Sequence, residues 1–116
     1  TCWLEESAFD LFTALIGSGP AYIFYFIEAL QKAAKGLNLD ESTTKELITE
    51  MIKGSSTLAN QSEDSLSLLR EKVTSPGGVT EKALEVLNRK EVNLSIIEAI
   101  LEATDKSKTL GGFKID

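Results

Sequence analysis

Hydroxyl side chains flank a glycine pair in the stretch KVTSPGGVTEK at residues 72–82, where Ser75 and Thr80 stand on either side of Gly77 and Gly78. Backbone N–H groups around glycines that lead into a helix form a site for an anion, because their dipoles converge and no Cβ blocks the approach. A carboxylate or a phosphate would fit, and the two hydroxyls would add hydrogen bonds. A structural interpretation stays open, in which the stretch is a tight turn and Thr80 caps the next helix.

A second glycine-containing corner, GSGPAY at residues 17–22, also precedes a predicted helix. Its Ser18, Gly19 and Pro20 would hold a phosphate or a nicotinamide near the helix start, or would simply form a corner between two helices. The spacing is not that of G-x-G-x-x-G after a strand, so the corner is not a dinucleotide-binding fingerprint.

Charged residues near the SPGG turn are candidates for a supporting role. Glu63 precedes a predicted helix, where a solvated carboxylate that complements the helix dipole is the ordinary interpretation. Lys72 and Lys82 flank the turn and would attract an anion, although most surface lysines attract nothing in particular.

Composition narrows the kinds of chemistry that this chain can perform. It has 116 residues, which predicts one domain over residues 1–116, a formal net charge of −6, no His and a single Cys. Without His, a Ser-His-Asp or Cys-His catalytic set and a Cys/His zinc site are excluded, and we expect no metal. No basic patch indicates nucleic-acid binding. The lone Cys2 fits a reducing compartment, so we expect a cytoplasmic protein.

The elements that must position these residues are all predicted to be helices. A short helix carries Phe9, Phe12 and Ile16 and ends at residues 17–19. Longer helices follow at 21–35, with Gly36 after its end, and from a cap at Asp40 to about residue 60, with Leu47, Ile48, Met51, Ile52 and Leu58 on its buried side. A fourth helix begins at Ser62 or Asp64, a fifth near Thr80, and a sixth is capped by Asn93 and ends at Gly111 and Gly112. The pattern predicts an all-α, multi-helix bundle.

Two of these helices carry more apolar surface than one contact face requires. Residues 21–27 are apolar on every side, and the helix at 94–110 leaves only one polar stripe. The pattern favours a second copy of the chain that completes the core, although both helices would also suit the centre of a monomeric bundle. The uncharged stretch 11–27 holds 17 residues against about 20 for a bilayer span, and the corner at 17–20 interrupts it, so we expect no membrane insertion.

Two segments together give this chain a resemblance to a known family. FTALIGSGPAYIFYFIEAL at 12–30 and LREKVTSPGGVTEKALEVLN at 69–88 closely resemble the C-terminal domain of pyrroline-5-carboxylate reductase. The WLEE start at 3–6 is also similar to that family, and the resemblance runs from about Trp3 to Leu110. It implies a helical domain that interlocks two subunits, taken from an enzyme that reduces 1-pyrroline-5-carboxylate to L-proline with NADPH or NADH.

The resemblance also implies roles for the residues at the two corners. Ser75 and the N–H groups around Gly77 and Gly78 would receive the substrate carboxylate. Thr80, the implied catalytic residue, would hydrogen-bond the ring nitrogen near the nicotinamide. Ser18, Gly19 and Pro20 would lie close to the reactive end of the cofactor, and Glu63 would lie near the site.

The chain departs from the family pattern in ways that affect these expectations. Ile16 stands where the family commonly has Ser, and residues 88–93 lack the glycines often found there, so the helix from Thr80 is expected to run longer. The N-terminal Rossmann domain that binds NAD(P) is expected to be absent from this chain. The alternative function is a free-standing helical dimerisation module without catalysis.

Overall fold

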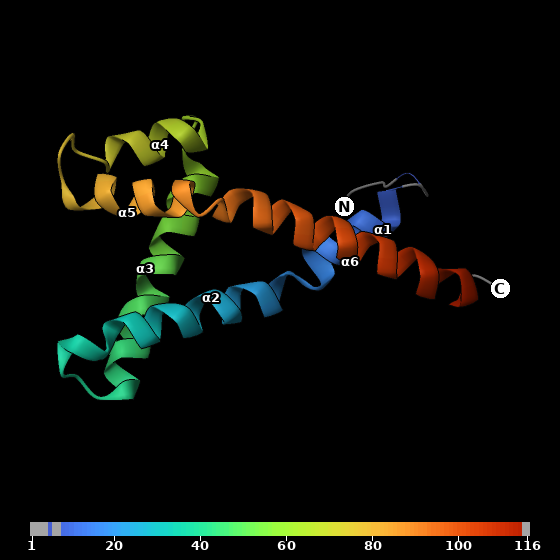
Figure 1. The fold of residues 1–116 in the computed structure, drawn as a ribbon, viewed down its shortest axis with the longest axis horizontal. Helices are drawn as coiled ribbons and strands as arrows, with labels where there is room; N and C mark the ends of the chain where they lie inside the picture. The colour runs from blue at the N-terminus through green and yellow to red at the C-terminus, as the bar shows by residue number, and fades with distance from the viewer. Residues whose placement is uncertain (1–4, 6–7, 115–116) are drawn as a thin grey trace. The chain divides into compact units, whose positions relative to one another are not determined.

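The computed structural model describes residue 5 and residues 8–114, with side chains described as far as residue 110. Most of the WLEE start and the last two residues lie outside the described part of the chain. Every regular element in that part is helical, as predicted. In chain order they are α1 (Phe9–Phe12), a π-helical turn (Thr13–Gly17), α2 (Gly19–Ala33), a 3₁₀ turn (Ala34–Leu37), α3 (Glu41–Gln61), α4 (Leu66–Lys72), α5 (Val79–Arg89) and α6 (Val92–Lys114) (Figure 1).

The first of two compact units comprises Thr1–Ile23 and Leu87–Asp116. In it, α1 and the π-helical turn pack against α6. The Ser107 hydroxyl donates to the Asp10 carboxylate at 2.8 Å, across 97 positions of sequence. The Tyr22 hydroxyl donates to the Ala14 carbonyl at 2.7 Å, and Ala14 is buried. The second of these bonds spans the corner at residues 17–20, between the π-helical turn and the start of α2.

The second unit, Phe24–Val86, contains the other predicted corner. Asp40 caps α3 as predicted, and its carboxylate accepts from the Thr43 N–H at 3.0 Å. The hydrogen bonds from Thr43, first from its side chain and then from its backbone, hold the pKa of Asp40 below its usual range. Ser65 caps α4 in the same way, since its hydroxyl accepts from the Leu68 N–H at 3.2 Å.

Several predicted boundaries were wrong for identifiable reasons. Ser62, with φ −79° and ψ 146°, ends α3, and the extended Ser65 rather than Ser62 or Asp64 caps α4. After α2, the left-handed residue is Asn38 at φ 61° instead of Gly36, because asparagine tolerates that conformation better than most residues.

The last two helices also differ from their predicted lengths. The helix from Thr80 does not run on, because Glu91 adopts φ 55° without being a glycine and accepts from the Ser95 N–H at 3.0 Å. That bond starts α6 at Val92, so Asn93 is not its cap. The same helix continues through Gly111 and Gly112, because glycine lowers helix propensity without forbidding a helix.

Neither of the two compact units has a hydrophobic core of any size among the described residues. Among the described residues, the only buried apolar side chain is Ala14. The predicted buried side of α3 is wrong for the chain alone, since Leu47, Met51 and Leu58 are each more than half exposed. Along α2, Phe24 and Tyr25 are 63% and 78% exposed. These faces are predicted to be covered, and neither of the two units covers them by itself.

The N-terminal third also passes a test for membrane insertion by length and composition. Phe9–Leu37 reaches a mean hydropathy of 1.3 over 18 residues. It is not one regular helix, because the π-helical turn ends at Gly17 and α2 begins at Gly19. A helix at the centre of an assembly of two chains has the same composition, so this test does not separate the two environments.

Candidate functional site

The SPGG stretch folds into a type II turn. The Ser75 carbonyl accepts from the Gly78 N–H at 2.9 Å, Pro76 occupies the second position, and Gly77 has a φ of +73° at the third. A Cβ on Gly78 would lie 3.1 Å from the Ser75 carbonyl oxygen. The turn therefore needs both glycines for different reasons. Gly77 supplies the positive φ, and Gly78 allows the close approach to the Ser75 carbonyl.

Both hydroxyl residues of the turn are exposed and available to a ligand. Thr80 is the second residue of α5, so it lies inside the helix and does not cap it, which removes the structural interpretation of this residue. The Ser75 and Thr80 hydroxyls make no hydrogen bond within the described part of the chain. Thr74 differs, because its hydroxyl donates to the Arg70 carbonyl at 2.6 Å, just after the end of α4.

The backbone N–H groups of the turn divide into two sets. Those of the two glycines have acceptors: Gly78 donates to Ser75, and Gly77 donates to the Glu81 carboxylate at 2.8 Å. Val79 and Thr80 are the first two residues of α5, and their N–H groups have no acceptor among the described residues. The positive end of the α5 dipole and two unused donors therefore meet the two hydroxyls at one exposed place.

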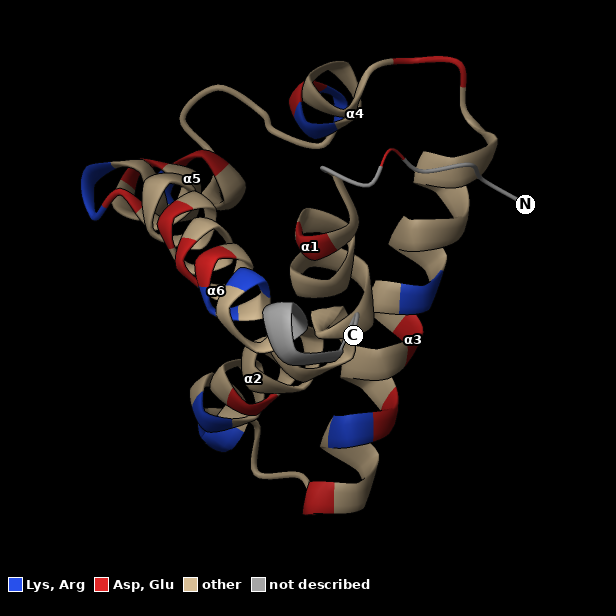
Figure 2. Ribbon diagram, turned by 90° about the vertical axis from the view of Figure 1, so that its right-hand side faces the viewer, with Lys and Arg blue, Asp and Glu red and all other residues tan. Residues whose placement is uncertain are grey.

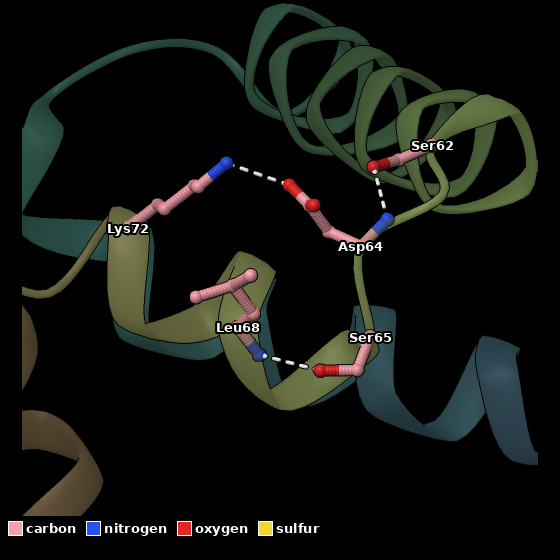
Figure 3. A network of polar contacts seen from close by, with 5 residues as sticks. All are labelled: Ser62, Asp64, Ser65, Leu68 and Lys72. Atoms are coloured by element: carbon pink, nitrogen blue, oxygen red, sulfur yellow. Dashed lines mark hydrogen bonds and ion pairs between the residues drawn. The ribbon is translucent and has the colours of Figure 1, made fainter.

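A network of polar contacts holds the segment between α3 and α4, which carries Glu63 (Figure 3). The Asp64 N–H donates to the Ser62 hydroxyl at 3.0 Å, and Lys72 Nζ lies 2.6 Å from Asp64 Oδ2. This ion pair joins the segment to the last residue of α4, three positions before Ser75. Glu63 itself is exposed and takes part in no hydrogen bond or ion pair of the described chain.

Each lysine beside the turn forms an ion pair with a neighbouring carboxylate. Lys72 pairs with Asp64, and Lys82 Nζ lies 3.2 Å from Glu85 Oε1, one turn further along α5. α3 also carries both basic and acidic residues along its length (Figure 2). Among the described residues, no group of three His, Cys, Asp or Glu side chains comes together to hold a metal. The described turn thus offers an anion hydroxyls and N–H groups rather than lysine side chains.

The corner at residues 17–20 belongs to the first unit. The Ser18 N–H donates to the Thr13 carbonyl at 2.9 Å and closes the π-helical turn, while the Ala21 N–H donates to the Ser18 carbonyl at 3.0 Å. Gly19 and Pro20 are the first two residues of α2. Ser18 and Pro20 are exposed, so the corner is open to a ligand. The structure places Ser75, Gly77 and Gly78 in one turn and Thr80 just after it, in the first turn of α5, whereas Ser18–Pro20 lie in the first unit.

Comparisons with known proteins agree with this all-helical arrangement. The family model described as pyrroline-5-carboxylate reductase dimerisation matches residues 6–110. Pyrroline-5-carboxylate reductase 2 of Bacillus subtilis is 40% identical over 104 residues, which cover 90% of this chain and 37% of that protein. The pyrroline-5-carboxylate reductase of Pasteurella multocida is 36% identical over 113 residues, which cover 95% of this chain and 41% of that protein.

Solved structures show the same fold. The 1-pyrroline-5-carboxylate reductase of Streptococcus pyogenes matches with a TM-score of 0.89 and 36% identity, over 94% of this chain and 42% of that chain. The Plasmodium falciparum enzyme, solved with NADP bound, matches with a TM-score of 0.88 and 33% identity, over 93% of this chain and 41% of that chain.

Fold, exposed apolar faces and family match together define the class as an all-α dimerisation domain. The chain belongs to the pyrroline-5-carboxylate reductase dimerisation family. It spans roughly two fifths of the length of the curated relatives described above.

One residue of the turn was missed when the sequence was read alone. Glu81 contacts the backbone of the glycine pair, but its position in the first turn of a helix marks it only as a residue that complements the helix dipole. Glu81 stands three positions after Gly78, the spacing of a capping box, but its carboxylate accepts from Gly77, one residue earlier, so that spacing does not identify the contact.

Proposed function

We propose that this chain is the C-terminal dimerisation and substrate-binding part of a pyrroline-5-carboxylate reductase, which reduces 1-pyrroline-5-carboxylate to L-proline with NADPH or NADH. One observation carries the proposal. In a domain of this family, the turn at residues 75–80 presents two exposed hydroxyls and two unused N–H groups at the start of an 11-residue helix. A small cyclic imine that bears a carboxylate offers acceptors and a negative charge that suit these donors.

The substrate carboxylate is assigned to the first part of the turn. The Ser75 hydroxyl would donate to one oxygen, and N–H groups from the glycine turn into α5 would donate to the other. Gly77 and Gly78 shape this cradle, since a side chain on either would strain or crowd the turn. The N–H of Gly77 joins the set only when its bond to Glu81 is released.

The reaction adds a hydride to the carbon of the C=N bond and a proton to its nitrogen. The nicotinamide supplies the hydride when bound, so the residues of this chain have to orient the ring and meet its changing charge. The Thr80 hydroxyl is assigned to the ring nitrogen, where it would hold a hydrogen bond as the nitrogen changes charge. Ser18, Gly19 and Pro20 are assigned to the nicotinamide end of the cofactor, and Glu63 to the edge of the site.

Binding of the rest of the cofactor is assigned to another part of a longer protein. The described residues contain no strand and no Gly-rich strand-to-helix turn of the kind that cradles a dinucleotide. The NADP-bound relative is more than twice as long as the segment that matches this chain. The Rossmann domain expected from the resemblance would supply that function in the full-length enzyme.

The exposed apolar faces are assigned to a second copy of the chain. Phe24 on α2 and Ile97 on α6 are each more than half exposed, and each belongs to a helix with a wide apolar surface. A symmetric partner would cover the same faces on both subunits, which is the usual form of a homodimer. This assignment also accounts for the apolar Phe9–Leu37 segment without a membrane. Cytoplasmic location and the lack of nucleic-acid or metal partners remain predictions.

The test compares two substitutions in the full-length enzyme. Thr80→Ala should lower kcat about 10- to 150-fold, which corresponds to the loss of a hydrogen bond to a charged group of ~1.5–3 kcal/mol. Ser75→Ala should mainly raise KM for 1-pyrroline-5-carboxylate, because other donors to the carboxylate remain. Thr80→Ser keeps the hydroxyl and should recover most of the turnover.

Two outcomes would contradict the assignment. If Thr80→Ala and Ser75→Ala raise KM equally and leave kcat unchanged, Thr80 binds substrate without acting on the transition state. If the full-length wild-type protein dimerises but reduces no cyclic imine, the chain is a helical dimerisation module without catalysis.

A further inference from the structure

We propose that the Glu81 carboxylate occupies the substrate-carboxylate position at Gly77 N–H in the substrate-free enzyme, so that Glu81 sets the affinity for substrate and product. The inference rests on the proposed function, which gives the N–H groups of this turn to the substrate carboxylate. It adds a residue that competes with the ligand from within the chain.

The contact is of the kind that the ligand itself would make. Glu81 Oε1 accepts from the Gly77 N–H at 2.8 Å, a good distance for a hydrogen bond between an amide and a carboxylate. Gly77 and Glu81 are both exposed, so a carboxylate from solvent can reach the same N–H. A side-chain carboxylate on this donor demonstrates that the turn geometry accepts one.

The turn does not depend on Glu81 for its shape. Its closing bond runs from the Gly78 N–H to the Ser75 carbonyl at 2.9 Å, and Pro76 fixes the φ of the second position. The ion pair between Lys72 and Asp64 holds the preceding helix end by a separate contact. Release of Glu81 therefore frees one donor while the cradle keeps its conformation.

The negative charge of Glu81 opposes the binding of a second carboxylate at this turn, as its hydrogen bond to Gly77 does. Within the described chain Glu81 makes no ion pair, whereas both neighbouring lysines are engaged, Lys72 with Asp64 and Lys82 with Glu85. An incoming carboxylate therefore meets an unneutralised negative charge as well as an occupied donor. Glu71, in the last turn of α4, is also exposed and makes no ion pair within the described chain, which makes a control for general charge possible.

The ligands affected are small carboxylates, and the substrate and the product belong to the same class. If Glu81 must leave before the substrate carboxylate is fully bound, its return favours release of the product carboxylate. Removal of the Glu81 carboxylate should therefore strengthen the binding of both substrate and product. A merely structural residue would not produce this pattern.

The experiment uses the full-length enzyme and the variants Glu81→Gln and Glu81→Ala. Glu81→Gln removes the charge and keeps a weaker acceptor, while Glu81→Ala removes both. We expect each variant to lower KM for 1-pyrroline-5-carboxylate and the inhibition constant for L-proline by about 3- to 10-fold, with Glu81→Ala at the larger end. Glu71→Gln removes the same charge from the last turn of α4, where Glu71 is exposed and makes no ion pair within the described chain, and should change both constants less than twofold.

Three results would overturn the proposal while the wild-type enzyme remains active. One is that both Glu81 variants leave KM and the L-proline inhibition constant unchanged. Another is that Glu81→Ala raises KM, which would make Glu81 a brace for the turn. The third is that Glu71→Gln lowers the constants as much as Glu81→Gln does, which would leave only a general charge effect. A full-length wild-type enzyme that reduces no cyclic imine would instead refute the proposed function on which the inference rests.

Discussion

Ile97→Glu should break the proposed dimer. Ile97 is 53% exposed in the single chain. Full burial of an isoleucine contributes ~1.5–3 kcal/mol, so covering the remaining half contributes about 0.8–1.5 kcal/mol per subunit and twice that in a symmetric pair. An unpaired carboxylate at the same place adds a desolvation penalty of at least similar size. The sum is roughly 3–6 kcal/mol, which corresponds to a dissociation constant about 100- to 10,000-fold higher.

Sedimentation equilibrium on the purified chain measures this constant directly over a range of concentrations. Lys106→Glu is the matched control, because Lys106 belongs to the polar stripe of the same helix with Glu98, Glu102 and Asp105. It introduces the same residue and changes the net charge by more, yet it should leave the dissociation constant within a few-fold of wild type. A wild-type chain that is a helical monomer at micromolar concentration would refute the reasoning. Equal weakening by the two substitutions would show that net charge, not burial, governs association.

Two further predictions concern activity and pH. The purified chain of residues 1–116 should not oxidise NADPH in the presence of 1-pyrroline-5-carboxylate, because no described element can cradle the dinucleotide, and measurable turnover would contradict the division of roles between domains. The lowered pKa of Asp40 means that its stabilisation of α3 is present above the pKa of the unfolded chain, about 3.9, and is lost as pH falls through the folded value. Thermal unfolding followed by circular dichroism should therefore show that Asp40→Asn is less stable than wild type at neutral pH, and that the difference shrinks at about pH 3.

The helices could be predicted from sequence because their signals are local. Asp40 at a cap and the period of apolar residues along residues 41–60 required no knowledge of distant contacts, and both helix type and position were confirmed. Helix ends were harder to predict where a residue adopts a backbone conformation that its type disfavours. Glu91 takes a left-handed conformation that favours glycine, and no composition rule marks a glutamate for that role.

Burial was the least predictable property of the fold. The period of Leu47, Met51 and Leu58 correctly indicates one face of a helix, but periodicity does not state which chain covers that face. The exposed side chains of α2 have the same explanation. A pattern along one chain records the total burial in the assembled protein, and the single chain shows only part of it.

The candidate site was predicted in its residue types and not in its internal bonding. Pro76 and the two glycines predict a turn, and its type II geometry follows from their positions. Glu81 was missed because its partner is a backbone N–H four positions earlier, and the residue types alone do not reveal such a contact. The roles of Ser75 and Thr80 toward a ligand remain predictions that the kinetic experiments above will test.

The near absence of a core has a thermodynamic consequence for a chain that pairs with itself. If Ala14 is the only described apolar side chain buried without a partner, folding and association become one bimolecular reaction. The melting temperature should then rise with protein concentration, and refolding should become second order when the chain is dilute. Exchange of subunits would require partial unfolding, so two differently tagged dimers mixed at low temperature should form hybrids only slowly.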